Sequence, residues 1–553
     1  MKKHLAGLLA LVVSFSFFTA CGKSTSTPAD KPVADSSQTS AGSSGEQVAS
    51  NERRANNELV VAISSEPQAG LDPTVGWGHG TAPLVQSTLV RYQEDKTIVN
   101  DLATAYELSE DGLTWTFNLR DDAKFTDGQP VTAKDVAFTI ETAQAKESSL
   151  DLTVIDSCEA KSDHEVVFHL KQPSSTFINM VASLGIVPAH LYDENYGQQP
   201  VGSGPWKFVQ WNRGEQIILA ANEDYYGEVP AIKQATIVFM DEDAAFAAAV
   251  AGQVDVALTG PIQATREIEG MTLKNISTLD NRGFTLPLTP NEGKTTADGY
   301  PIGNDVTSQK SIRQAMAYAL DREQLAQDAV NGYATPAYSE NDGMPWNNPA
   351  VKIETDVEKA KQILADDGWQ DTDGDGVLEK DGLKAEFTCL YADNDASRLA
   401  VATAAAQQLE TIGIKVNLEG SNWDDISKKM FSNAVMMGWG SANPYTSYLL
   451  YHSKSAYQDD FYNPEGLENK QIDAYLDAAV ASLSEAEAYE NWQKAQWDGE
   501  TGTCMKGECP WVWMINIDHL YYVADGLDIG PQQLHAHGAS WTLLENLAAW
   551  SWE

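Results

Sequence analysis

Positive charge is scarce in this sequence. Lysine and arginine number 37 against 79 aspartate and glutamate residues, and the formal net charge at pH 7 is -42. A surface of that sign repels phosphates, so the composition argues against a nucleic-acid partner. Beyond the N-terminus no apolar run is long enough to cross a bilayer. Both absences suit an exported protein that works in water.

The signatures of common enzyme classes are missing as well. The sequence contains no GxSxG elbow, no HExxH helix, no GxGxxG after a strand and no Walker loop. No other stretch pairs a nucleophile with a recognisable base. We therefore predict that the protein is not an enzyme and requires no cofactor.

Cysteine is rare, with five residues in the whole chain. No pair of CxxC motifs occurs, which excludes a zinc site of four thiolates. Cys504 and Cys509 enclose the short loop CMKGEC, and an oxidising compartment would favour a disulfide between them. We predict that bridge and interpret Cys158 and Cys389 as isolated core residues.

Residues 1–20 have the pattern of a signal peptide. A charged start is followed by an apolar run and then by small residues before Cys21. The segment FTAC resembles a bacterial lipobox, and the resemblance implies that Cys21 becomes the lipidated first residue. We predict a protein that is exported and lipid-anchored to the cell membrane, facing the extracytoplasmic side. An ordinary signal, cleaved nearby with Cys21 incidental, is the alternative.

Residues 21–57 are predicted to be a flexible, lipid-anchored tether. They are rich in serine, threonine, alanine and asparagine and contain almost no bulky apolar residue. Such a segment buries too little surface to offset the entropy lost on folding.

The rest of the chain has a mixed α/β pattern. Strand-like stretches begin at Glu58, Leu113 and His164, and an alanine-rich helix ends at Gly252 and leads directly into a strand. His519 alternates as a core strand residue. Nearly 500 residues predict two or three domains.

Five stretches, taken in order, resemble the peptide/nickel-binding family of bacterial extracytoplasmic solute receptors. They are LSEDGLTWTFNLRDDAKFTDGQPVTAKDVAFTI (108–140), VGSGPWKFVQW (201–211), NEDYYGEVPAIKQATIVFM (222–240), AGQVDVAL (251–258) and SIRQAMAYALDREQL (311–325). The resemblance implies an α/β periplasmic-binding-protein fold with two lobes around a ligand cleft and an extra subdomain on the first lobe. It also implies delivery of the ligand to the permease and ATPase subunits of an ABC importer in the membrane.

The family pattern divides the chain into segments. It places 58–92, 201–289 and 501–553 in the first lobe, 93–200 in the extra subdomain and 290–500 in the second lobe. Lobes that close around a ligand bury it and create a surface that the permease distinguishes from the open form. No bond needs to be made or broken, and we expect a monomer.

The segment MMGWGSANPYTSY (436–448) is similar to the family's cleft segment on the second lobe. The resemblance makes Trp439, Asn443 and Tyr445 expected ligand contacts. In the dipeptide and oligopeptide receptors, an acidic residue four positions before the proline holds the peptide's α-ammonium group. Gly440 stands at that position here, which argues against a peptide with a free amine.

Three of the nine histidines lie in two glycine-containing segments. His79 belongs to TVGWGHGTAP, whereas His535 and His537 belong to LHAHG, which the family pattern folds back towards the first lobe. Imidazole suits nickel, copper and zinc, so these histidines predict a partial shell for a transition metal. An exposed turn is the alternative for the C-terminal pair. Trp77 and Trp541, in the same two stretches, are further expected ligand contacts.

One acidic loop resembles part of a calcium site. DTDGDGVLEKDG matches the first half of an EF-hand loop, but its twelfth position is a glycine where a bidentate glutamate is needed. We expect weak Ca(II) binding at best, and an acidic turn is the alternative. The candidate ligands are Asp371, Asp373, Asp375 and Glu379.

These observations predict a substrate-binding lipoprotein of a peptide/nickel-type ABC importer. We favour nickel or another chelated transition metal as its ligand. A dipeptide or oligopeptide is the alternative within the class. A ligand sensor or peptide chaperone without its own permease is the alternative outside it.

Overall fold

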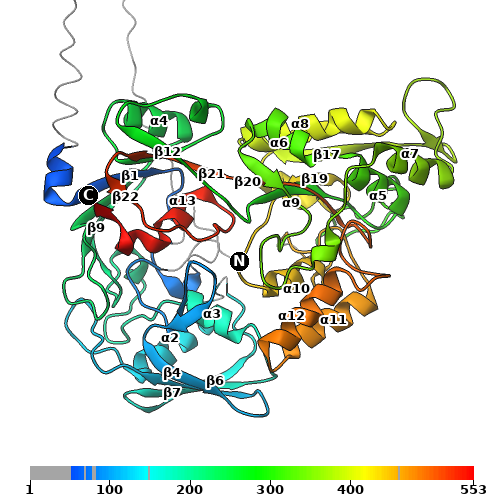
Figure 1. Cartoon of the computed structure of the whole chain (residues 1–553). Coiled ribbons are helices and arrows are strands. Elements are labelled where there is room, and N and C mark those ends of the chain that lie inside the picture. The colour runs from blue at the N-terminus through cyan, green and yellow to red at the C-terminus, as the bar shows by residue number, and fades with distance from the viewer. Residues whose placement is uncertain (1–50, 68–69, 77–82, 147, 149, 459–460) are drawn as a thin grey trace, which may run out of the picture.

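The computed structural model describes residues 51–67, 70–76, 83–146, 148, 150–458 and 461–553 (Figure 1). The predicted signal peptide, Cys21 and most of the predicted tether lie outside these residues, as do Trp77 and His79. No helix within the described residues has the length and apolar character needed to cross a membrane.

The folded body begins earlier than the predicted end of the tether at residue 57. Residues 51–56 are helical. Arg53 donates two hydrogen bonds of 2.8 Å to the buried carboxylate of Asp255. Arg54 donates to the carbonyl oxygen of Glu553 at 2.9 Å. These contacts hold the segment on the body, which corrects the prediction that it is flexible.

A seven-stranded sheet forms the first lobe, in the order β12-β21-β11-β1-β10-β9-β8. β1 pairs in parallel with β10 and β11. The helix α4 (Glu242–Val250) leads into β11 through Gly252, whose φ of 66° favours glycine. This is the helix-to-strand unit that the sequence predicts. The strands are β1 (Glu58–Ile63), β8 (Trp206–Asn212), β9 (Gln216–Ala221), β10 (Gln234–Phe239), β11 (Val256–Thr259), β12 (Met271–Ile276) and β21 (His519–Ala524).

A six-stranded sheet, covered by helices, forms the second lobe, in the order β14-β20-β13-β19-β17-β18. Its strands are β13 (Asn281–Thr285), β14 (Ala334–Pro336), β17 (Glu386–Ala392), β18 (Lys415–Ser421), β19 (Ala434–Met437) and β20 (Trp511–Ile517). Its helices are α5 (Lys310–Ala319), α6 (Arg322–Val330), α7 (Val357–Asp366), α8 (Ala396–Glu410), α9 (Trp423–Lys429), α10 (Tyr445–Tyr451), α11 (Lys470–Ala481) and α12 (Glu485–Gln496).

The extra subdomain has a four-stranded sheet in the order β4-β5-β7-β6 and its own core. In that core, the ring of Phe168 packs edge-on against Phe117 and Phe177 at 5.5 and 5.1 Å. Its elements are β4 (Ala103–Leu108), β5 (Thr114–Leu119), α2 (Ala133–Ala145), β6 (Ile155–Ser162), β7 (Glu165–Leu170) and α3 (Phe177–Ser183). The subdomain lies below the first lobe and beside α11 and α12 (Figure 1).

The chain passes between the two large sheets between β12 and β13, and again between β20 and β21. β13 and β20 belong to the second sheet, although the predicted ranges 201–289 and 501–553 assign them to the first lobe. The stretch WVWMINIDHLYYV has one continuous strand pattern, so only the pairing partners reveal where it changes sheets. The predicted boundary at residue 92 also divides a hairpin, because β2 (Val90–Tyr92) pairs with β3 (Ile98–Asn100).

The remaining elements are short. They are β15 (Glu379–Lys380), β16 (Leu383–Lys384), β22 (Leu527–Asp528), α13 (Ala539–Thr542) and β23 (Ser551–Trp552), with the 3-10 turns η1 (Pro73–Val75), η2 (Tyr196–Gln198), η3 (Gln263–Thr265), η4 (Pro349–Val351), η5 (Ser453–Ser455) and η6 (Leu543–Ala549).

Candidate ligand-binding site

A cleft of about 1590 Å³ lies where the first lobe, the extra subdomain and the second lobe meet. The extra subdomain contributes the hairpin β2–β3 and the loop before β6. The second lobe contributes the segment after β19 and the start of α10, and the first lobe contributes part of the chain after β22. All three parts of the molecule thus contribute to the walls of the cleft.

The three residues predicted in the cleft segment all line the cleft. The backbone N–H of Trp439 donates to the side-chain oxygen of Asn281 at 2.9 Å, and its ring lies 5.0 Å from that of Tyr462. The side chain of Asn443 accepts from the backbone N–H of Tyr445 at 3.0 Å, at the start of α10. These contacts orient the segment from within the second lobe.

Gly440 is required by a close backbone contact. A Cβ atom added there would lie 2.1 Å from the carbonyl oxygen of Leu279. His537 also donates its backbone N–H to the Gly440 carbonyl at 3.0 Å, so the segment packs against the C-terminal part of the first lobe. An acidic side chain therefore has no room at this position.

Arg398 is a cleft residue that the sequence analysis missed. It lies in the first turn of α8 with 5% of its surface exposed, and it lines the cleft. Its Nε donates to Asp395 and its Nη1 to the carbonyl of Met436, both at 2.9 Å, and the guanidinium lies 5.0 Å from the Trp423 ring. A cation near a helix N-terminus is unfavourable because it opposes the helix dipole. An arginine in the first turn of a predicted helix is therefore the sequence signal that could have drawn attention to Arg398.

Burial and the charge of Arg282 lower the pKa of Arg398 to about 10, while Asp395 opposes the shift. The side chain therefore stays cationic at pH 7. Within the described residues no hydrogen bond uses its Nη2 atom, which is available to an anionic ligand group.

The charges that line the cleft are mixed. The lining includes four lysine and arginine residues and six aspartate and glutamate residues. On the wall opposite α8, Arg120 lies over the ring of Tyr226 at 3.9 Å, and the Tyr226 hydroxyl donates to Asp101 at 2.6 Å. Carboxylates thus outnumber the cations of the lining by two.

The C-terminal histidines surround a buried aspartate at the crossing between the lobes. Asp280 contacts the Nε2 of His519 at 3.2 Å and the Nδ1 of His537 at 2.6 Å, and Arg282 donates to it as well. Burial opposes the charged form, but Arg282 and His537 outweigh it and hold the pKa of Asp280 well below its usual range. Of the predicted histidines in the described residues, only His537 lines the cleft.

His535 is fully buried, so the alternative of an exposed turn does not hold for this residue. Its Nδ1 lies 3.0 Å from the Nδ1 of His519, and its Nε2 lies 3.3 Å from the side-chain oxygen of Gln532. Burial, His519 and Lys96 lower the pKa of His535 well below its ordinary value. Both ring nitrogens are engaged within the protein, so this geometry does not present His535 to a metal in the cleft.

Trp541 packs away from the cleft lining. Its indole N–H donates to the carbonyl of Ser65 at 3.1 Å, and its ring lies 6.4 Å from that of Phe239. The structure thus assigns it to the packing of the first lobe against β1 and β10 rather than to the predicted ligand contact.

Cys504 and Cys509 are free, buried thiols, so the predicted disulfide is absent from the structure. The Sγ of Cys509 lies instead 3.6 Å from the carbonyl oxygens of both Arg313 and Trp511, either of which can accept its single S–H. Burial raises the pKa of the Cys509 thiol to about 12, which disfavours the thiolate needed for exchange. Spacing along the chain brings the residues close but does not orient the two sulfur atoms.

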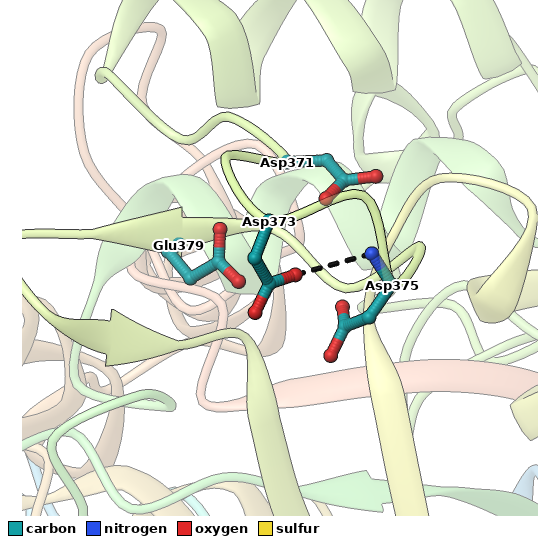
Figure 2. A group of neighbouring side chains, drawn as sticks. All are labelled: Asp371, Asp373, Asp375 and Glu379. Atoms are coloured by element: carbon teal, nitrogen blue, oxygen red, sulfur yellow. Dashed lines mark hydrogen bonds between the residues drawn. The ribbon is translucent and has the colours of Figure 1, made fainter.

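The four candidate calcium ligands lie close together, with Asp371, Asp373 and Asp375 on an exposed loop and the partly buried Glu379 at the start of β15 (Figure 2). Asp371 and Asp373 accept hydrogen bonds from the backbone of the same loop. The ammonium of Lys384 lies 3.0 Å from Asp373 and 3.3 Å from Glu379, and it also contacts Asp375. A lysine already occupies the side of the loop where a cation would bind.

We therefore expect Ca(II) to bind this loop no more tightly than the millimolar range, because it must displace Lys384 and lacks the glutamate at the twelfth position. Calorimetric titration of the wild type and of Lys384→Ala tests this. The variant should bind Ca(II) more tightly, since one competing charge is gone. Micromolar binding by the wild type would contradict the expectation.

Comparison with known proteins shows the family to which this chain belongs. Residues 97–461 match the model of the bacterial extracellular solute-binding proteins, family 5. The chain belongs to that family. Protein XP55 of Streptomyces lividans is 31% identical over 492 residues, with 85% of each chain covered. The oligopeptide-binding protein AppA of Bacillus subtilis is 29% identical over 479 residues, covering 82% of this chain and 83% of AppA.

A solved structure of this family shows the same fold. NikZ of Campylobacter jejuni, in complex with Ni(L-His), is 25% identical with a TM-score of 0.75, over 90% of this chain and 99% of NikZ. The family assignment and the two-lobed α/β fold predicted from the sequence are confirmed. The protein is a substrate-binding protein of the peptide/nickel ABC importer family, whose members are solute-binding proteins and not enzymes.

Proposed function

We propose that this solute-binding protein captures short peptides for an ABC importer and that Arg398 binds a ligand carboxylate. The buried guanidinium on the cleft wall is the observation that carries the proposal. A carboxylate accepts a charge-assisted hydrogen bond from a guanidinium, here from Nη2, and the low exposure of Arg398 strengthens such a contact. Every linear peptide with a free C-terminus offers that group.

The size of the cleft supports a peptide. Small-molecule sites typically measure about 300 to 1,000 Å³, and this cleft of about 1590 Å³ is larger. An extended peptide fills such a volume better than a compact metal chelate. The name of AppA, an oligopeptide-binding protein, agrees with this reading.

The mixed charge of the cleft lining also supports a peptide ligand. A peptide carries an ammonium and a carboxylate, and the lining offers groups of both signs. Although Gly440 provides no ammonium ligand, acidic side chains such as Asp101 lie on the opposite wall. A strongly anionic chelate would face six carboxylates, which disfavours it.

A nickel chelate is the second candidate, because His537 lines the cleft and the similar NikZ was crystallised with Ni(L-His). The structure brings one predicted histidine to the cleft, and His79 lies outside the described residues. Among the described residues, one of the predicted histidines thus reaches the cleft, and one imidazole makes a weaker metal site than three.

Calorimetry separates the two candidates. The full chain is titrated with a mixed pool of tri- to octapeptides, with Ni(II), and with Ni(II) plus free histidine, each with and without EDTA. We expect the peptides to bind in the micromolar range or tighter, unaffected by EDTA. Binding of only the nickel mixtures, abolished by EDTA, would overturn the peptide proposal in favour of the chelate.

We also propose that Cys21 carries a lipid anchor after cleavage of the signal peptide. The apolar run and the FTAC segment support it. Cys21→Ser should move the protein from the membrane fraction to the soluble fraction without altering its melting temperature, because the acyl chains bind the bilayer and the body does not need them. Cell fractionation measures this, and a membrane-bound Cys21→Ser variant would refute the anchor.

An uptake assay distinguishes a transport protein from a ligand sensor. Cells that lack this protein should accumulate labelled peptide more slowly if it feeds a permease. Unchanged uptake together with tight binding would favour the sensor or chaperone alternative.

A further inference from the structure

The extra subdomain and the second lobe touch each other beyond the cleft. Ser175 donates its backbone N–H to the carbonyl of Val480 and its hydroxyl to the carbonyl of Ala479, both at 2.8 Å. Leu483 lies over Gly112, where an added Cβ would come within 2.3 Å of the leucine side chain. Ser175 and Ala479 are 304 positions apart in the chain. These contacts join the extra subdomain to the second lobe outside the cleft lining.

A second contact of this kind lies on the cleft itself. The Tyr445 hydroxyl of α10 donates to the Oδ2 of Asp151 in the extra subdomain at 2.9 Å. Both residues line the cleft, and they are 294 positions apart in the chain. The ring of Tyr445 stacks on that of Tyr448 at 5.2 Å with an interplanar angle of 9°, which fixes its direction.

We propose that the hydrogen bond between Tyr445 and Asp151 is a cross-cleft latch that sets how long any ligand is retained. The proposal rests on the proposed function, in which closure of the lobes captures the ligand. The bond joins two protein groups, so its free energy favours the closed state by the same amount for every ligand. When the lobes separate, the bond is lost, and ligand escape requires that separation.

The same helix provides a matched control. The Tyr448 hydroxyl donates to the Oδ1 of Asp477 at 3.2 Å, and this bond joins α10 to α11 within the second lobe. Neither Tyr448 nor Asp477 lines the cleft. Both bonds join a tyrosine hydroxyl to an aspartate carboxylate, and only one of them crosses between the parts that separate. Tyr448 differs in also accepting from Lys454 at 3.1 Å.

Dissociation rates of a labelled tetra-, hexa- and octapeptide test the latch by stopped-flow fluorescence. Tyr445→Phe should increase the dissociation rate about tenfold for all three peptides, or about 1.4 kcal/mol. Asp151→Asn should act similarly, and the double variant should add little, as expected for partners in one bond. Tyr448→Phe and Asp477→Asn should stay within about twofold of wild type, because a bond within one lobe is made in both states.

An effect of Tyr445→Phe that differs between peptides would make Tyr445 a ligand contact and overturn the latch. Equal effects of Tyr445→Phe and Tyr448→Phe would also overturn it. If no peptide binds the wild type, the proposed function fails, and small-angle scattering of the ligand-free proteins then decides the latch. The latch predicts that Tyr445→Phe is less compact than both wild type and Tyr448→Phe, and equal radii of gyration refute it.

Discussion

Replacing Arg398 with glutamine should weaken binding of the peptide pool about a hundredfold, which corresponds to about 2.7 kcal/mol. The buried guanidinium is the cation on the second-lobe wall of the cleft, and a carboxylate that loses it stays desolvated without a partner. Calorimetry measures the affinity. The peptide affinity of Arg398→Lys should lie between those of the wild type and Arg398→Gln, because an ammonium keeps the positive charge but lacks the planar geometry of the guanidinium.

Two controls separate lost binding from lost structure. Arg213 lies over the ring of Trp211 on the first lobe and is absent from the cleft lining, so Arg213→Gln should bind as the wild type does. The near-ultraviolet circular dichroism of Arg398→Gln without ligand should match the wild type. Unchanged peptide affinity in a correctly folded Arg398→Gln would show that the carboxylate binds elsewhere.

Replacing Asp280 with asparagine should lower the free energy of unfolding by about 3 to 5 kcal/mol. The carboxylate is 3% exposed and is the shared partner of Arg282, His519 and His537 at the crossing between the lobes. Its loss leaves a buried guanidinium without that counter-charge. Urea unfolding followed by tryptophan fluorescence measures the change. Asp298→Asn, at an exposed turn, is the control and should stay within about 0.5 kcal/mol of wild type.

The pH dependence of stability gives a second test of Asp280. Because the folded protein holds the pKa of this carboxyl below its unfolded value of about 3.9, its contribution is fully present above that pH. It is lost as the pH falls from there towards the folded pKa. The difference in stability between wild type and Asp280→Asn should therefore shrink in acid. A constant difference from pH 7 to pH 3 would contradict this account.

The local pattern of the sequence was sufficient to predict the class of fold. Strand and helix periodicity depends on neighbours a few positions apart, so the α4–β11 unit and the strands of the extra subdomain were readable directly. The order of the motifs predicted the family, and the stretch 436–448 placed Trp439, Asn443 and Tyr445 in the cleft lining. Each of these features is encoded within a short stretch of chain.

Local sequence patterns did not show to which sheet each strand belongs where the chain passes between the lobes. β20 and β21 form one continuous strand-like stretch, and the change from the second sheet to the first appears only in their pairing partners. The free thiols of Cys504 and Cys509 are a similar case, because spacing brings two cysteines near each other and side-chain direction decides whether they bond.

The sequence alone thus determined that this chain is a two-lobed solute-binding protein with a cleft segment near its proline at position 444. Only the tertiary structure decided which side chains that cleft presents. Arg398 meets the cleft through the packing of α8, and Asp280 meets His519, 239 positions away, at the crossing between the lobes. Contacts between residues so far apart in the chain form only when the whole protein has packed. The burial and hydrogen bonding of each residue then depend on distant elements, which no local sequence pattern specifies.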